Sequence, residues 1–355
     1  MSTKTAIEWT DATWNPVTGC TKVSAGCKHC YAERKWPRLA GNPKTVYYGR
    51  QFADVLTHGD RLDQPIRWTK PRMIFVNSMS DLFHEAVPDD FIDSVFGVMW
   101  ACLWGRNEKP GHVFQVLTKR AGRMRDYLLQ DRREYWARAA VNYGGGIDPD
   151  LIWDQVMGAD GPHPRIWIGV SVEDQKSAEE RIPTLLEMPA AVRWISAEPL
   201  QGPVNLTAIL PEYPERLDAL EGRLYCDEPH TAGSYEEVPR LDWVVVGGES
   251  GPKARPMHPD WARSLRDQCN AAGVPFLFKQ WGEFATEYQS GRDINFCYDR
   301  STTGGWIEMD GTYSLGDGAA PSDPMTAEHV FRIGKKAAGR LLDGREWNQY
   351  PEISS

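Results

Sequence analysis

Three cysteines lie within eleven residues near the start of the chain, in the segment Cys20-Thr-Lys-Val-Ser-Ala-Gly-Cys27-Lys-His-Cys30. No further Cys or His follows at a spacing that would complete a local four-ligand zinc site. Three clustered thiolates without a local fourth ligand are typical of a cubane 4Fe–4S cluster that leaves one iron open for a cosubstrate. The segment therefore indicates a metal centre. An iron–sulfur cluster is the first hypothesis, and zinc held with His29 or a distant ligand is the alternative.

Length, composition and charge limit the classes of protein that fit. The chain has 355 residues with 41% apolar content, enough for one large barrel or two ordinary domains. It contains no run of 18 apolar residues and no apolar stretch typical of a signal peptide, and its seven cysteines are an odd number. These features predict a cytoplasmic protein without a membrane span. A net charge of −9 argues against broad binding to duplex nucleic acid, and it leaves room for a local basic groove.

The elements that must position these cysteines follow from the apolar pattern. Six short apolar runs alternate with amphipathic helical patterns, and a further strand is expected near the N-terminus. The runs are 73–77, 113–117, 166–170, 193–196, 242–247 and 275–279. This alternation predicts an α/β fold built on a partial or full TIM-like (β/α) barrel of parallel strands, with a doubly wound open sheet as the alternative.

The remaining segments are expected to form insertions in this barrel and an extension after it. We predict a barrel over residues 1–285, with insertions at about 131–164 and 203–240. The first insertion ends in glycine-rich loop sequence. Residues 286–355 form a small C-terminal extension of polar, hairpin-like sequence. A short helix is expected after Cys30, over 31–36, and Pro37 should stop it.

Polar residues collect where the predicted strands end, which is where parallel barrels carry their functional groups. We expect these strand ends to meet at one mouth. The Gly247-Gly-Glu-Ser-Gly251 turn favours close backbone approach to a ligand. The candidates are Asn77, Ser78, Asp81, Lys119, Arg120, Ser171, Glu173, Glu198, Gly247, Gly248, Glu249, Arg255 and Lys279.

Together, the cysteine segment and the strand ends resemble the radical S-adenosylmethionine superfamily. More narrowly, the chain is similar to a phage- and prophage-encoded family without an agreed function, through Thr18-Gly-Cys20, Gly26-Cys27 and Cys30-Tyr-Ala-Glu33. The likeness continues through the segments 77–81, 117–119, 169–171, 196–199, 247–250 and 339–343. The commonest superfamily spacing is Cys-x3-Cys-x2-Cys, whereas this chain has Cys-x6-Cys-x2-Cys.

The resemblance implies a role for most of these residues. Cys20, Cys27 and Cys30 would bind the 4Fe–4S cluster, and the other implied positions would surround S-adenosylmethionine. Asn77, Ser78 and Asp81 would lie near its methionine end, Ser171 and Glu173 near its ribose, and Gly247 and Gly248 near its adenine. Glu198 and Glu249 are further candidates for the cofactor-binding set. Lys119, Glu198, Arg255 and Lys279 would face the substrate or the cosubstrate carboxylate.

The function implied is that of a radical enzyme. One electron from the cluster, supplied by an external electron donor, would generate a 5′-deoxyadenosyl radical that abstracts hydrogen from a substrate. The substrate is unknown, and the phage setting suggests a nucleobase or nucleic acid. The alternative is a non-catalytic zinc-binding barrel that acts as an interaction module.

Overall fold

A computed structural model describes residues 5, 7–103, 111–209, 215–226, 234–290, 304–316 and 321–352. Cys297 and most of the predicted turn at 301–305 lie outside these residues. The chain divides into two compact units. The first contains residues 1–170, 187–193 and 352–355, and the second contains residues 171–186 and 194–351.

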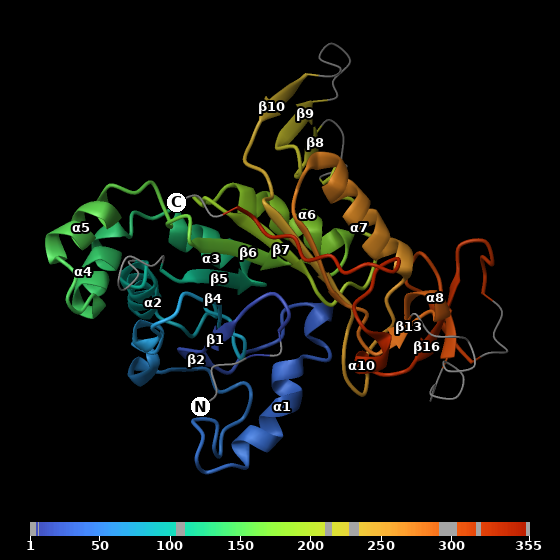
Figure 1. The fold of residues 1–355 in the computed structure, drawn as a ribbon, viewed down its shortest axis with the longest axis horizontal. Coiled ribbons are helices and arrows are strands. Elements are labelled where there is room, and N and C mark those ends of the chain that lie inside the picture. Colours follow the sequence, from blue (N-terminus) through green and yellow to red (C-terminus); the bar gives the residue numbers. More distant parts are fainter. Residues whose placement is uncertain are drawn as a thin grey trace. The chain divides into compact units, whose positions relative to one another are not determined.

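Seven parallel strands form the central sheet, in the order β1-β4-β5-β6-β7-β11-β12 (Figure 1). The strands are β1 (Ala12–Trp14), β4 (Met73–Val76), β5 (Val113–Thr118), β6 (Ile166–Ser171), β7 (Arg193–Ala197), β11 (Trp243–Gly247) and β12 (Phe276–Gln280). In this order β1 and β12 are the two edges, so the sheet is open. The predicted α/β class is thus confirmed in its partial-barrel form.

In the first unit, β1, β4, β5 and β6 pair in parallel, with Val76 opposite Trp14 and Val116 opposite both Val76 and Ile168. Most residues of these strands are buried, as expected of a parallel sheet covered by helices. Two predicted helices follow their strands, α2 (Asp89–Ala101) after β4 and α3 (Ala121–Leu128) after β5. The short strands β2 (Val17–Thr18) and β3 (Leu56–Thr57) pair with each other. The 3₁₀ turns are η1 (Ala25–Cys27), η2 (Gly59–Arg61) and η3 (Pro65–Arg67).

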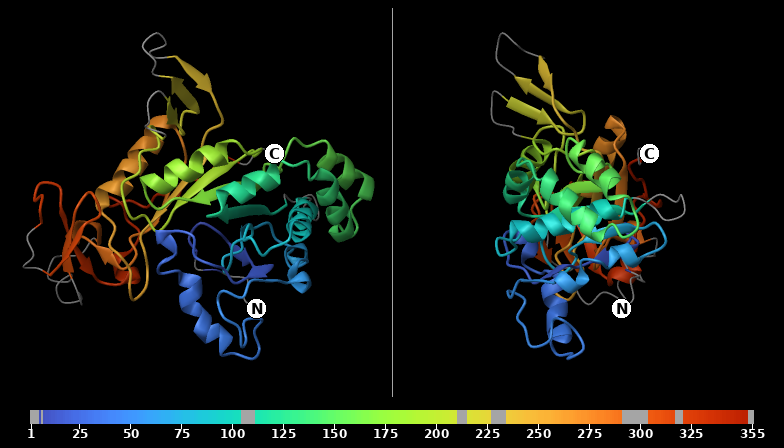
Figure 2. Two further views of the ribbon diagram at one scale, coloured as in Figure 1. Left: turned by 180° about the vertical axis from the view of Figure 1, so that it is seen from behind. Right: turned by 90° about the vertical axis from the view of Figure 1, so that its left-hand side faces the viewer.

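The insertion at 131–164 contains two helices that the sequence pattern did not predict, α4 (Arg133–Tyr143) and α5 (Pro149–Met157). They lie side by side, coloured green in Figure 2. Helix α4 packs on α2: the Phe96 and Trp136 rings stack at 5.0 Å, and Trp136 Nε1 donates to the Tyr127 hydroxyl at 2.8 Å. This tertiary packing makes up for a weak helical pattern.

Helix α1 (Tyr31–Ala40) continues through Pro37, contrary to the prediction that this proline would stop it. Proline removes one backbone donor from the helix interior. The helix persists because Ala32 and Trp36 are buried in a cluster with Tyr47 and Met79. The Pro37 carbonyl still accepts from Gly41 N at 3.0 Å, so the chain turns normally after the proline.

The second unit carries β7, β11 and β12, with Val245 opposite Ser196 and Leu277. Its helices are α6 (Gln175–Leu186) and α7 (Pro259–Ala272). Gly273 ends α7 in the left-handed region, at φ 67°. Helix α6 runs through Pro183, while its Ile182 and Leu185 side chains are fully buried and hold it in place.

Two antiparallel sheets complete the second unit. The predicted insertion at 203–240 forms a three-stranded sheet of β8 (Glu215–Asp218), β9 (Arg223–Cys226) and β10 (Tyr235–Glu237). The C-terminal region forms a four-stranded sheet of β13 (Phe284–Ala285), β16 (Glu328–Arg332), β14 (Gly304–Ile307) and β15 (Tyr313–Leu315). Helices α8 (Glu287–Ser290) and α10 (Lys335–Ala338) accompany it. Across the described ranges, none of the helices combines the length and apolar character that crossing a bilayer requires.

Candidate functional site

The cysteine loop of the first unit is tied to the carboxyl end of β4. Gly19 bridges to Ser80, and Cys20 N donates to the Phe52 carbonyl at 2.9 Å. Gly19 has φ 92°, and a Cβ atom at this position would lie 2.3 Å from the Asp54 carbonyl oxygen. Only glycine fits such a position. Gly19 therefore sets the backbone conformation that places Cys20 near the end of β4.

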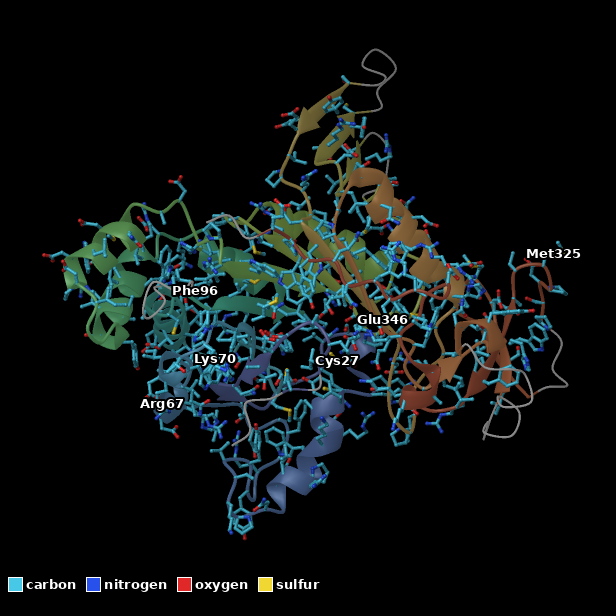
Figure 3. The ribbon with its side chains drawn as sticks, in the orientation of Figure 1. Cys27, Arg67, Lys70, Phe96, Met325 and Glu346 are labelled. Atoms are coloured by element: carbon cyan, nitrogen blue, oxygen red, sulfur yellow. The ribbon has the colours of Figure 1, made fainter. Side chains whose placement is uncertain are left out.

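The other two cysteines sit where the loop becomes helical. Cys27 closes η1, with Ser24 Oγ 3.8 Å from Cys27 Sγ, and Cys30 is the residue that precedes the first turn of α1. Figure 3 labels Cys27 beside this end of the helix. The Tyr31 hydroxyl donates to the Ser78 carbonyl, which ties the start of α1 to the loop after β4. All three thiols are half-buried.

Each thiol has a different electrostatic environment. Burial raises the pKa of Cys20 to about 12, with further contributions from Asp81 and Cys27 that Arg120 opposes. Burial also raises the pKa of Cys30. For Cys27, burial acts in the same direction, but hydrogen bonds with the loop backbone and the Lys119 ammonium lower its pKa below the usual value. Cys27 is therefore the first of the three to supply a thiolate, the form that binds metal.

A buried ion pair lies directly against Cys20. Arg120 Nη1 is 3.2 Å from Asp81 Oδ2 and 3.7 Å from Cys20 Sγ, and Arg120 Nη2 donates to Thr21 Oγ1 at 2.9 Å. Arg120 follows β5 and Asp81 follows β4. One guanidinium thus connects two strand ends to the cysteine loop, and it places a positive charge where a thiolate would form.

This contact extends to His84 and Glu85. Ala86 N donates to His84 Nδ1 at 3.0 Å, so Nε2 carries the proton and donates to Thr21 Oγ1 at 2.8 Å. Burial lowers the pKa of His84, which favours this neutral form. Arg120 Nε also donates to Glu85 Oε1 at 2.9 Å. The sequence pattern placed Arg120 at a strand end, but neither composition nor spacing could indicate that it contacts Cys20.

The three residues expected near the methionine end of a cosubstrate lie together in the loop after β4. Asn77 adopts φ 61°, and its Oδ1 accepts from Val17 N at 3.2 Å. Ser78 Oγ donates to Asn15 Oδ1 at 3.2 Å. Both Asp81 oxygens are occupied: Oδ1 accepts from Thr118 Oγ1 and Phe83 N, and Oδ2 from Lys119 N and Arg120. Both Asp81 oxygens therefore bind groups of the protein itself, and one of them orients Arg120.

In the second unit, Ser171 and Glu173 form one cluster with Arg181. Arg181 Nη1 donates to the Ser171 carbonyl at 2.8 Å and to Glu173 Oε2 at 3.0 Å. The side chains of Arg181 and Glu173 are almost completely buried. A buried carboxylate needs such a partner. The Arg181 pair fixes the orientation of Glu173 at the start of α6.

Glu198 pairs with Lys279, and the adjacent glycines pack closely on the protein itself. Lys279 Nζ lies 2.6 Å from Glu198 Oε1 and 2.8 Å from Oε2. A Cβ atom on Gly247 would lie 3.4 Å from Glu198 Cδ, and one on Gly248 would lie 2.0 Å from the Trp281 carbonyl oxygen. Gly248 therefore serves the close approach of two backbone segments within the unit.

Glu249 forms a forked ion pair with Arg255. Arg255 Nε donates to Glu249 Oε2 and Arg255 Nη2 to Oε1, both at 2.9 Å. Arg255 Nη1 also donates to Gln201 Oε1 at 2.6 Å. This bidentate geometry is rigid and well suited to orienting a turn. It holds the segment after β11 in one conformation.

The cysteine loop fits a metal centre by its donor chemistry. Three thiols share one loop, and the Lys119 ammonium helps to lower the pKa of Cys27, whereas burial outweighs Arg120 and raises the pKa of Cys20. Among the residues that the structure describes, no three His, Cys, Asp or Glu side chains are grouped so that they could hold a metal ion. The fit therefore rests on the type of the donors and on their spacing in the sequence.

The sequence matches the family described as "Protein of unknown function (DUF5131)" over residues 4–351. No curated protein and no solved structure matches the chain significantly. Since the match covers almost the whole length, the chain belongs to this family of unknown function.

Proposed function

We propose that the chain is a radical S-adenosylmethionine enzyme whose 4Fe–4S cluster is bound by Cys20, Cys27 and Cys30. The observation that supports this most directly is the attachment of the cysteine loop to the carboxyl ends of β4 and β5. Gly19 bridges to Ser80 after β4, and Arg120 after β5 reaches Cys20 Sγ at 3.7 Å. Parallel (β/α) proteins carry their chemistry at this edge of the sheet.

When bound, the cluster would supply the electron that cleaves S-adenosylmethionine to a 5′-deoxyadenosyl radical. The residues of the chain hold and tune the site. Lys119 favours the ionised form of Cys27, and Arg120 opposes the burial that raises the pKa of Cys20. The Arg120 and His84 contacts to Thr21 keep the loop in a single position. Asp81 balances the charge of Arg120, so its role is to position the loop.

The loop after β4 is the proposed place for the methionine end of the cosubstrate. Asn77 and Ser78 lie in it, and the Tyr31 hydroxyl links it to the helix that begins after Cys30. The proposed roles of Ser171, Glu173, Glu198, Gly247, Gly248 and Glu249 stay predictions from the resemblance. An external electron donor is required, and a nucleobase or nucleic acid is the proposed substrate class.

The test is the metal content of protein reconstituted anaerobically with iron and sulfide. The wild type should bind about four irons with matching sulfide, which is the composition of the proposed cluster. Cys20→Ala, Cys27→Ala and Cys30→Ala should each lose most of it. Cys226→Ser is the matched control, because Cys226 is also half-buried but lies in the second unit. Stoichiometric zinc without sulfide would contradict the proposal and favour the zinc-binding interaction module.

A further inference from the structure

Residues 21–50 form a basic segment in an acidic chain. They contain seven Lys and Arg against one Glu, a net charge of +6, whereas the whole chain carries −9. The one acidic side chain, Glu33, is paired with Lys22, whose Nζ lies 2.8 Å from Glu33 Oε2. A local excess of this size creates a positive potential that attracts polyanions.

Helix α1 presents part of this charge on one face. Arg34, Lys35 and Arg38 are exposed, and they follow Tyr31 at spacings of three, four and seven residues, which is one stripe of an α-helix. The opposite face carries Ala32 and Trp36, which are buried against Tyr47 and Met79. The apolar face anchors the helix, so the cationic face points to solvent.

Tyr31 adds an aromatic ring to the same stripe. Its hydroxyl is bound to the Ser78 carbonyl, the residue is 39% exposed, and Lys35 Nζ lies 5.5 Å from the ring centroid. A ring held in one position loses little conformational entropy when a base stacks on it. Tyr31 directly follows Cys30. A base stacked on Tyr31 would therefore lie next to the cysteine loop.

We propose that this stripe, Tyr31, Arg34, Lys35 and Arg38, binds a single-stranded nucleic acid. The three cations contact phosphates, and Tyr31 stacks with an unpaired base. A single strand fits better than a duplex because an exposed ring stacks only with a base that is out of its pair. A fixed aromatic ring among the cations also favours a nucleic acid over an acidic protein. That the bound strand is the substrate rests on the proposed function.

The first test is the salt dependence of binding to short fluorescent DNA and RNA single strands, measured by anisotropy. Each phosphate neutralised contributes about 0.7 to the slope of log affinity against log salt. The triple variant Arg34→Gln, Lys35→Gln, Arg38→Gln should bind more weakly, and the magnitude of this slope should fall by about 2.

The matched control is Arg125→Gln, Arg133→Gln, Arg138→Gln. It changes the net charge equally but removes cations from α3 and α4. It should bind like the wild type.

The second test separates base stacking from charge. Tyr31→Leu removes the aromatic ring and should weaken binding by about 5- to 150-fold, the range measured for loss of one stacked base. Tyr31→Phe keeps the ring but loses its bond to the Ser78 carbonyl, so it should bind much more tightly than Tyr31→Leu and slightly more weakly than the wild type. The difference in affinity between DNA and RNA strands of the same sequence then shows which of the two the surface prefers.

The proposal would be overturned by unchanged binding of the triple variant, by unchanged binding of Tyr31→Leu, or by equal affinity for a matched duplex. Tighter binding to a poly-glutamate peptide than to the single strands would also overturn it, in favour of an acidic protein partner. Iron content is measured on the same samples. Strand binding without a cluster would contradict the proposed function alone, and a cluster without strand binding would contradict this inference alone.

Discussion

Replacing Arg120 with leucine removes the side chain that joins the cysteine loop to the ends of β4 and β5. Arg120 contacts Asp81, Glu85, Thr21 and the Cys20 thiol. The side chains of Arg120 and Asp81 are only 5% and 8% exposed. In Arg120→Leu, the Asp81 carboxylate therefore stays buried without a neighbouring cation.

The expected loss follows from these contacts. Removing one partner of a buried ion pair costs about 3–5 kcal/mol of unfolding free energy. Asp81 keeps hydrogen bonds from Thr118, Phe83 and Lys119, which favours the lower end of this range. The Glu85 side chain is 66% exposed, so its pair with Arg120 adds less than about 1 kcal/mol. We expect a loss of about 3 kcal/mol.

The assay is urea unfolding of the metal-free protein under reducing conditions, followed by tryptophan fluorescence. The double variant Asp81→Asn, Arg120→Leu serves as the control. It should recover about 1–2 kcal/mol of the loss, because it no longer buries an unpaired charge. A loss of less than about 1 kcal/mol in Arg120→Leu, or a double variant less stable than the single one, would refute this reasoning.

Two further predictions concern stability. Gly248→Ala should lower the unfolding free energy, measured in urea, by about 1–3 kcal/mol, because its Cβ would lie 2.0 Å from the Trp281 carbonyl oxygen. Gly122→Ala, whose Cβ would have no atom within 4 Å, should raise it by up to about 1 kcal/mol. Equal stability of the two variants would contradict this account. Burial, helped by Arg61 and Arg50, lowers the pKa of His58 from 6.5 to about 4. The unfolded chain therefore takes up this proton first, and the unfolding free energy should fall as the pH drops from 6.5 towards 4. His58→Gln should reduce this slope in a pH series of urea unfolding, and an unchanged slope would show that other groups cause it.

The sequence predicted those parts of the fold that depend on the residue types within one short segment, such as a buried strand. The six apolar runs became parallel strands, because a strand covered on both faces is apolar at most positions. Gly273 ends α7 in the left-handed region, which is typical of a glycine that follows a helix. Such features are local, so spacing and residue type suffice to identify them.

The parts that the sequence did not predict depend on contacts between distant segments. Pro37 was expected to end α1, but Trp36 packs on Tyr47 and holds the helix through it. The contact between Arg120 and Cys20 joins residues one hundred positions apart. Gly248 was expected to approach a ligand, and its nearest backbone neighbour is Trp281. Periodicity carries no information on such pairs.

The most direct test of the proposed function is the EPR spectrum of the reduced, reconstituted protein before and after addition of S-adenosylmethionine. A cluster with one open iron should give a signal that changes when the cosubstrate binds, and Cys27→Ala should give no such signal. A spectrum that does not respond to S-adenosylmethionine would contradict the radical mechanism. A protein that holds zinc and gives no signal would contradict the cluster itself.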